Sequence, residues 1–544
     1  MNNSNLEGRS ALKKHKVGKW GVVFMIYCLV AAGAFGIEEM ISSSGPGLTL
    51  LMLIVFPIFW AYPISEMIAE LGSVLPSEGG PYVWTKKALG EFWGWQVGFW
   101  ETMAIWLCQA AYVVLVVGYL GKFFAMTDAQ AYAVKIGMIV IFTVVNLMGI
   151  KEVSKISTVL SLLVLAGFTA VALVGFTHWQ YNPVTPFLNE DEGLIGSIGG
   201  SICIAIWMYC GYEAMSNCAE EIEEPQNIPK GLIMAMPLIA LSYFLPTLAG
   251  LASTGNWENW GTEGNSTGYM DVLINNVGPW AGMAFLVIAI LSQCSIFNAY
   301  IASGSRGFFV MADDKLFPKF LVKVSKNKGV PHVSIIVMAI ITIILCQWDF
   351  QTLIMATTPL LLYLYIVLAI VTHRLRKIYP VEERKAKGLW VIPGGKVGLW
   401  FCTALPILIA LIALYVNGTE YFLSGYVLIF IGLIGYIICK LAYGGLVKLD
   451  PENHPINLKT RLAVGDITRI GIFTIMIGAS ALLGRVLLAW YEGEWGAEYY
   501  LEEYGSGLFS DFYGMLNILL GLGIAASVAG IIIVLIGKKV EPKV

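Results

Sequence analysis

Long apolar runs restrict the possible folds of this chain more than any other feature of its sequence. Fourteen runs of about 20 apolar residues recur along the 544 residues, each long enough to cross a bilayer. Backbone polar groups in lipid need internal partners, so a spanning segment must be a helix or part of a closed barrel. The sequence lacks the alternation of barrel strands. We therefore expect an all-α polytopic membrane protein with about 14 transmembrane helices.

The basic residues predict the orientation of these helices. Of the 34 Lys and Arg residues, all but Lys122, Lys135 and Arg485 lie on segments that would share one side of the membrane. Because cytoplasmic loops carry the excess of Lys and Arg, we expect both termini in the cytoplasm and the chain in the plasma (inner) membrane. All nine cysteines lie in or beside apolar runs, so no extracellular disulfide is expected.

Two of the apolar segments interrupt their own helices with glycine, and each interruption carries acid. Gly33 and Gly36 precede Glu38 and Glu39 in the first run, and Gly211 precedes Glu213 in the sixth. Buried acids in apolar spans persist mainly where protein or a water-filled cavity receives them. Interrupted helices at corresponding places in two halves of a membrane protein predict a site for a transported solute near the membrane midplane.

The positions of the two breaks predict the domain organisation. Spans 1–5 and 6–10 each begin with a broken member, and the odd count of five gives them opposite orientations. We expect a cytoplasmic tail over residues 1–20 and a transport core of ten helices over 21–375. A cytoplasmic loop with helices 11 and 12 follows over 376–446. Residues 447–544 would add helices 13 and 14, an acidic external loop and a short cytoplasmic tail.

The first break would bring together the positive end of one half-helix and the negative end of the other. Unwinding between Gly33 and Gly36 would leave free N–H groups at the start of the outer half-helix, which suit a carboxylate. The carbonyl groups that end the inner half would suit an ammonium. The alternative is that these small residues only let helices pack closely.

Aromatic residues crowd the second break. Trp207, Tyr209 and Tyr212 lie within a turn and a half of Glu213. An aromatic face there could cover an amine or guanidinium, and Glu213 could pair with that cation or take up a proton. The alternatives are ordinary core packing for the aromatic residues and a structural hydrogen bond for the carboxylate.

Polar residues in other runs have weaker interpretations. Gln109, in the middle of the third run, could bind substrate or a neighbouring helix, whereas Glu101 lies nearer the cytoplasmic end and is left out of the site. Glu66 and Glu70 share a helix face near the inner boundary, where gate or loop partners are expected. The acidic run over residues 220–224 is either a solvated face or a partner for basic loops.

The sequence contains no pattern typical of an enzyme. The five histidines lack metal-ligand spacing, and no nucleophile–base pattern, phosphate loop or nucleotide-binding domain is present. We therefore expect neither catalysis nor ATP-driven pumping, and no cofactor, metal or nucleic acid partner.

Three loop motifs resemble the amino acid–polyamine–organocation superfamily. These are PSEGGPYVWTKKALG at residues 76–90, AEEIEEPQNIPKG at 219–231 and SRGFFVMADDKLFPKF at 305–320. The resemblance covers about residues 20–440. GAFGIEE, LIVFPIFWAYPISEMIAELG and FWGWQVGF look most like the polyamine and cationic amino acid permeases, and IPGGK is similar to the glutamate–aminobutyrate exchangers.

The resemblance implies a leucine-transporter-type fold of five plus five inverted helices and secondary transport by alternating access. Trp207, Gly211 and Glu213 match a pattern of the arginine–agmatine exchangers, which implies an occluding aromatic and a proton-sensitive coupling acid. Similar alignments make Gln109 a substrate-binding amide and bring Tyr300 toward the substrate. Val164 stands where some relatives carry a lysine in place of a sodium ion, and GAFG replaces the common G-[ST]-G.

Together these features predict a secondary permease or antiporter for amino acids that favours cationic or amine-rich substrates. A polyamine transporter, a neutral amino acid or decarboxylation-product exchanger, and a membrane sensor that moves nothing are the alternatives. The partners would be an amino acid or amine, a coupling proton or counter-substrate, and the lipid bilayer; the oligomeric state stays open. Glu213 is the candidate coupling residue. The candidate substrate-binding residues are Gly33, Ala34, Phe35, Gly36, Ile37, Glu38, Gln109, Trp207, Tyr209, Cys210, Gly211 and Tyr300.

Overall fold

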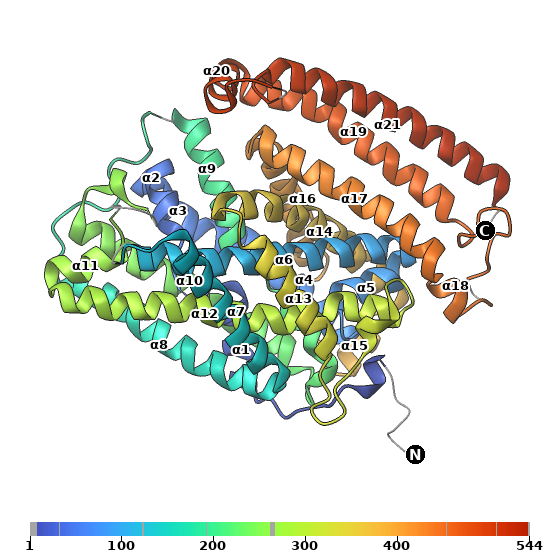
Figure 1. Ribbon diagram of the computed structural model, residues 1–544, viewed down its shortest axis with the longest axis horizontal. Helices are drawn as coiled ribbons and strands as arrows, with labels where there is room; N and C mark the ends of the chain where they lie inside the picture. Colours follow the sequence, from blue (N-terminus) through green and yellow to red (C-terminus); the bar gives the residue numbers. More distant parts are fainter. Residues whose placement is uncertain are drawn as a thin grey trace.

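Helices are the only regular elements in the part of the chain that the structure describes (Figure 1). The structure is a computed structural model and describes residues 8–31, 33–121, 124–191, 193–261, 267–452, 454–507 and 509–541. The expected ends of the two tails, residues 1–7 and 542–544, and Lys122 lie outside these ranges. The all-α prediction is confirmed.

Eleven helices of the described residues are long and apolar enough to cross a membrane. Three shorter apolar helices, Lys19–Val30, Gly196–Met208 and His332–Leu345, lie where the first, sixth and ninth spans are expected. Length and apolar composition therefore support a multi-pass membrane protein. The count of fourteen stays a prediction, because the two short members of the broken spans and the ninth helix do not reach the length of a full span.

The first half of the core starts with a broken helix. Its two parts are joined by residues 31–36, and a short helix, α5, connects the second long helix to the third. The elements are α1 (Lys19–Val30), α2 (Ile37–Ser44), α3 (Pro46–Phe56), the π-helix η3 (Pro57–Ala61), α4 (Tyr62–Val74), α5 (Gly80–Leu89), α6 (Glu91–Gly121), α7 (Asp128–Leu147) and α8 (Ile150–Thr177).

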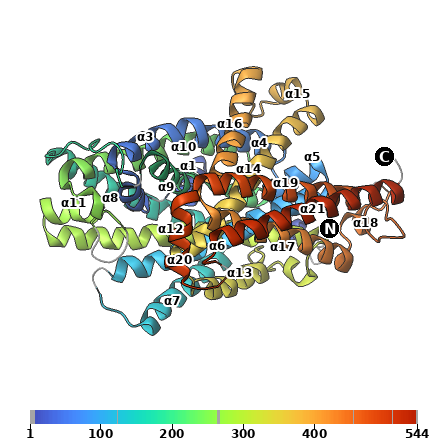
Figure 2. The same ribbon diagram turned by 90° about the horizontal axis from the view of Figure 1, so that it is seen from above.

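The second half repeats this order. Its elements are α9 (Gly193–Met208), the 3₁₀ helix η4 (Ala214–Glu221), α10 (Asn227–Thr254), α11 (Tyr269–Asn276), α12 (Pro279–Asp313), α13 (His332–Leu345) and α14 (Phe350–Ile378). The short connecting helices α5 and α11 lie at opposite ends of the helix bundle (Figures 1 and 2). This placement is what an inverted repeat requires, because matching connections then fall on opposite sides of the membrane.

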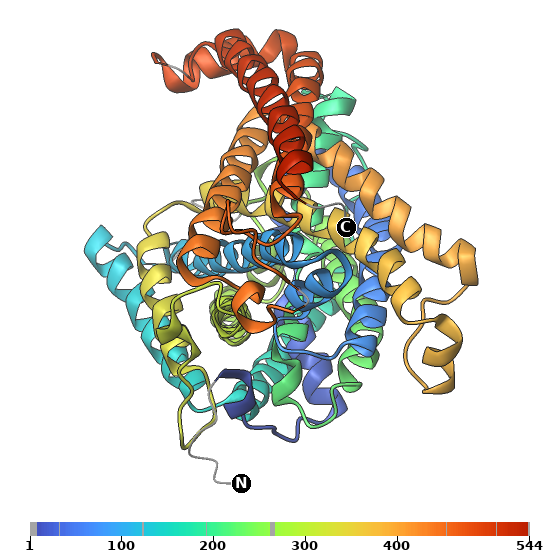
Figure 3. The same ribbon diagram turned by 90° about the vertical axis from the view of Figure 1, so that its right-hand side faces the viewer.

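The remaining helices lie outside this core. They are α15 (Val381–Ala386), α16 (Gly395–Val416), α17 (Thr419–Tyr443), α18 (Leu446–Leu449), α19 (Asp466–Tyr491), α20 (Gly493–Tyr504) and α21 (Phe512–Val540). The pair α19–α21, drawn in red, runs along the outside of the bundle and contacts it through α16, α17 and α6 (Figures 1 and 3).

Glycine lets α19 and α21 approach closely. A Cβ added to Gly471 would lie 2.9 Å from the carbonyl oxygen of Gly530, and one added to Gly478 would lie 2.8 Å from that of Gly523. Small residues at a helix contact let membrane helices pack closely, and this packing matters because the hydrophobic effect does not drive helix association in lipid. α19 and α21 therefore pack tightly against each other as a helix pair.

Both broken helices contact several helices of the core. In the first, α1 packs against α8, α10 and α12; in the second, α9 packs against α2, α3 and α14, and η4 packs against α12. The first described element, η2 (Gly8–Ala11), and the C-terminal end of α21 lie at the same end of the bundle as α5 and α18 (Figures 1 and 2).

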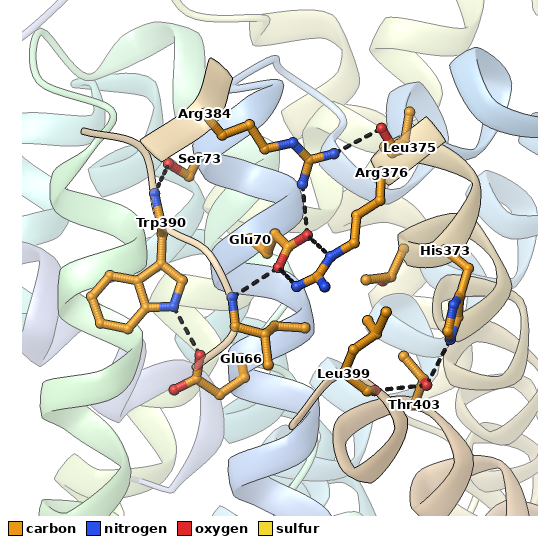
Figure 4. A network of polar contacts seen from close by, with 12 residues as sticks. Glu66, Glu70, Ser73, His373, Leu375, Arg376, Arg384, Trp390, Leu399 and Thr403 are labelled. Atoms are coloured by element: carbon orange, nitrogen blue, oxygen red, sulfur yellow. Dashed lines mark hydrogen bonds and ion pairs between the residues drawn. The ribbon is translucent and has the colours of Figure 1, made fainter. Parts of the chain in front are cut away.

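A buried carboxylate ties the segment between α14 and α16 to this end of the bundle. Figure 4 shows Glu70 between two guanidinium groups: Arg376 binds it at 2.7 and 2.5 Å and Arg384 at 2.6 Å. The backbone N–H of Ile392 adds a 2.8 Å hydrogen bond. One turn earlier, Glu66 accepts a 2.8 Å hydrogen bond from Trp390 Nε1. Both acids bind α14 or the segment after it, in line with the gate or loop partners expected from their position near the inner boundary.

Candidate functional site

The first break is held open by two glycines in left-handed conformations. Gly33 has φ +113° and Gly36 has φ +94°, values that residues with a Cβ rarely adopt. Glu38 folds back over this turn, and its Oε2 accepts a 2.9 Å hydrogen bond from the Gly36 N–H. The positive end of α2 is therefore already capped by a carboxylate of the chain itself, and only 3% of Glu38 is exposed.

The second break is also formed at a glycine in a left-handed conformation, and the N–H of this glycine has a tyrosine as its hydrogen-bond acceptor. Gly211 has φ +94°, and its N–H donates a 3.2 Å hydrogen bond to the Tyr365 hydroxyl. That hydroxyl in turn donates a 2.8 Å hydrogen bond to Glu213 Oε2. Glu213 is 1% exposed, and within the described residues no basic side chain reaches it at ion-pair distance. A buried carboxylate that lacks a basic partner is a candidate to bind a cation.

Tyr243 of α10 joins the two breaks. Its hydroxyl lies 3.2 Å from the carbonyl oxygen of Val30 and 3.0 Å from that of Met208, the last residues of α1 and α9. Two helix C-termini thus meet at one point. Each carries a partial negative charge of roughly half an electron, which stabilises a nearby cation.

A small cavity lies at this meeting point. It has room for about one water molecule. Four aromatic side chains contribute to its wall, and Trp207 stacks on Tyr112 with ring centroids 5.8 Å apart. The lining residues are Val30, Ala31, Phe35, Tyr112, Trp207, Met208, Tyr243, Gln293 and Ile296.

Comparison with known proteins identifies the family. A sequence profile of the amino acid permeases matches residues 17–443 of this chain. The chain belongs to the amino acid permease family. A probable polyamine transporter of Arabidopsis thaliana is 29% identical over 413 residues, which cover 74% of this permease and 80% of the relative.

Further relatives agree with this assignment. A polyamine transporter of Oryza sativa subsp. japonica is 27% identical over 371 residues, covering 65% of the permease and 66% of the relative. The crystal structure of MhsT in complex with L-phenylalanine superimposes with a TM-score of 0.57 over 74% of the permease and 100% of MhsT, at 11% identity. The last likeness shows the fold, which is the expected leucine-transporter type.

The structure distributes the candidate residues of the permease over three places. Phe35 and Trp207 line the cavity. Gly33, Gly36 and Gly211 shape the breaks, and Glu38 caps the first of them. Ala34 and Ile37 are buried in the first break, and Cys210 Sγ donates to the Trp207 carbonyl at 2.9 Å in the second.

The remaining three candidates, Gln109, Tyr209 and Tyr300, do not line the cavity and contact neighbouring helices. Gln109 Nε2 donates to Thr342 Oγ1 of α13 at 2.5 Å, which is the interhelical alternative. Tyr209 points toward α3 and donates to the Leu53 carbonyl at 3.4 Å. Tyr300 stands next to Tyr112, with ring centroids 5.6 Å apart, and close to Gly211.

The cavity also includes polar residues that the breaks alone do not predict. Gln293 of α12 lines it, is 1% exposed, and its Oε1 lacks a hydrogen-bond partner among the described residues. An amide in the middle of the apolar run over residues 279–313 is the signal that would have pointed to it. Tyr112 and Tyr243 give no such signal, because aromatic residues are common in apolar spans.

Glu101 differs from the expectation that it faces water or a basic loop. It is 2% exposed and accepts a 2.7 Å hydrogen bond from Asn217 Nδ2 of η4. Asn217 also donates to Ser303 Oγ at 3.2 Å, and Ser303 donates to the Ala214 carbonyl at 2.7 Å. The third-span acid therefore belongs to the same polar cluster as the second break.

The acidic run after the second break is only partly a solvated face, because Glu223 and Glu224 are exposed whereas Glu221 is buried. Glu221 accepts from Arg306 Nη2 at 2.6 Å, and Glu78 lies 3.6 Å from the same guanidinium; all three side chains are at most 1% exposed. Burial first, and then the neighbouring Glu221, raise the pKa of Glu78 well above its usual value. This cluster joins α12, the loop before α5 and the end of η4.

Proposed function

We propose that this permease is a secondary transporter of amine-rich cations, with polyamines as the first substrate class and cationic amino acids as the second. The substrate would occupy an enlarged form of the cavity between the two breaks. Alternating access would then expose this site to each side of the plasma membrane in turn, with both termini in the cytoplasm.

One observation carries the proposal: the carbonyl ends of α1 and α9 converge at Tyr243, beside a break whose carboxylate, Glu213, has a tyrosine donor but no basic partner among the described residues. Both features attract positive charge. The N-terminal end of α2, which would suit a carboxylate, already holds Glu38. A substrate with ammonium groups and no carboxylate fits this distribution of charge better than a neutral amino acid does.

Aromatic walls support the same substrate class. Tyr112, Trp207 and Tyr243 surround the cavity, and aromatic faces stabilise ammonium groups by about 0.5–2 kcal/mol. Relatives named as polyamine transporters match over most of the chain. A cationic amino acid would need Glu38 to release the Gly36 N–H so that its carboxylate can bind there.

Glu213 is the proposed coupling residue. With Tyr365 as its hydrogen-bond donor and no cation at ion-pair distance among the described residues, this carboxylate can exchange a proton for a substrate ammonium. A coupling proton or a counter-substrate would then drive net movement. Phe35 and Trp207 would occlude the site, and the glycines would supply the bend of each break.

A counterflow assay tests the proposal. Purified permease in proteoliposomes loaded with unlabelled putrescine, lysine or leucine is supplied with the matching labelled compound, at several pH values with and without sodium. We expect accumulation of label for putrescine, weaker accumulation for lysine and little for leucine. Binding without counterflow would indicate a sensor, and counterflow of leucine alone would contradict a cation site.

A further inference from the structure

A second buried carboxylate contacts η4, the helix that follows the second break. Glu101 of α6 is 2% exposed, and within the described residues no Lys, Arg or His lies at ion-pair distance from it. Among the described residues, its hydrogen-bond donor is the neutral amide of Asn217. A carboxylate in a membrane interior persists where a cation, a proton or water completes it.

One buried acceptor beside Glu101 lacks a hydrogen-bond donor among the described residues. Asn217 uses its amide N–H groups on Glu101 and Ser303, at 2.7 and 3.2 Å, and its Oδ1 has no partner among the described residues. Asn217 itself is 1% exposed. A carboxylate beside a buried, unpaired amide oxygen suits a ligand with several N–H donors, such as an ammonium group.

Helix spacing connects this place to Glu213. Glu213 directly precedes η4, and Asn217 follows four residues later, about 8 Å along a 3₁₀ helix. Ser303 bonds both Asn217 and the carbonyl of Ala214, the residue next to Glu213. The two acids therefore lie along one polar seam between η4, α6 and α12, at separate points.

We propose that Glu101 is a second cation-binding carboxylate of the transport site, so that one ammonium of a diamine pairs with Glu213 and the other with Glu101 and Asn217. This inference rests on the proposed function and refines it. It makes the number of ammonium groups, and not only the charge of the substrate, a determinant of affinity. A monoamine would use the Glu213 end alone.

The test compares Glu101→Gln with the wild-type permease in the counterflow assay, using putrescine and butylamine as probes. The glutamine amide oxygen can still accept the hydrogen bond from Asn217, so the interhelical contact survives while the charge is lost. We expect the KM for putrescine to rise at least ~10-fold and that for butylamine to change less than ~2-fold. The exposed Glu152→Gln variant serves as the matched control and should leave both values unchanged.

The outcomes separate this inference from the proposed function. Equal changes for both amines, or no change for putrescine, would overturn the role of Glu101 while leaving amine transport intact. Wild-type permease that exchanges no amine would instead overturn the proposed function. Asn217→Ala provides a second variant: loss of the amide should raise the KM for putrescine more than that for butylamine, and equal changes for both amines would contradict the site.

Discussion

The hydroxyl of Tyr365 donates a 2.8 Å hydrogen bond to the carboxylate of Glu213, across the centre of the second break. Since Tyr365 also accepts from the Gly211 N–H, it holds the acid and the bent backbone in one arrangement. Tyr365→Phe removes the donor and leaves the ring. We expect the apparent affinity for putrescine to change ~10- to 150-fold, because a hydrogen bond to a charged group is worth about 1.5–3 kcal/mol. An unchanged KM and pH profile of uptake would contradict this role.

The glycine of the second break should resist substitution. Gly211→Ala places a Cβ 2.7 Å from the Leu29 carbonyl oxygen and 2.9 Å from the Tyr300 hydroxyl, at a backbone φ of +94°. We expect transport to fall more than ~10-fold, because the break must straighten or the two helices must separate. Gly118→Ala is the matched control: this glycine of α6 has nothing within 4 Å of the added Cβ, so uptake should be retained. The readout is initial uptake per folded transporter.

The contact between Glu70 and the α14–α16 segment should contribute strongly to stability. Glu70→Ala leaves Arg376 and Arg384 without the carboxylate that both bind. Removing one partner of a buried ion pair costs about 3–5 kcal/mol. We expect a clear fall in the thermal unfolding temperature in detergent. Glu382→Ala, which removes an exposed pair with Lys385, should have almost no effect; similar shifts for both variants would contradict the assignment.

The pH dependence of stability should report on Glu78. Burial and Glu221 raise the pKa of this loop carboxyl in the folded state, so the folded permease binds more protons than the unfolded chain between the ordinary and the raised pKa. Stability from this group is therefore present at low pH and lost as pH rises through that window. We expect the Glu78→Gln variant to gain stability relative to wild type as pH increases from about 5 to about 8. A constant difference in unfolding temperature would contradict the shift.

The sequence predicts the parts of this permease that depend on local composition. Apolar runs predict the helices, and Gly33, Gly36 and Gly211 predict both breaks, because left-handed backbone favours glycine. Glu66 and Glu70 are predicted as gate or loop partners by their position near the inner boundary. These signals are contained within one or two turns of a helix.

Contacts between distant helices could not be predicted in this way. The partner of Gln109 is Thr342, 233 residues away, and nothing in the α6 run distinguishes that contact from a substrate contact. Glu38 accepts a hydrogen bond from the Gly36 N–H because the turn between them closes tightly, and the sequence does not show this closure. The N–H group expected to be free for a substrate carboxylate is therefore bound by a carboxylate of the chain itself. The sequence predicts Glu101 near water because it shows the depth of this residue along the helix but not the cover that η4 and α12 provide.

The most direct test of the cation site is the charge of Glu213. Labelled putrescine and labelled leucine are measured in counterflow with wild-type permease, Glu213→Gln and the control Glu152→Gln. If the break holds an ammonium, Glu213→Gln lowers putrescine exchange at least ~10-fold while any leucine exchange and the control are little affected. Putrescine exchange that survives in Glu213→Gln, or an equal loss for leucine, would contradict a site built for cations.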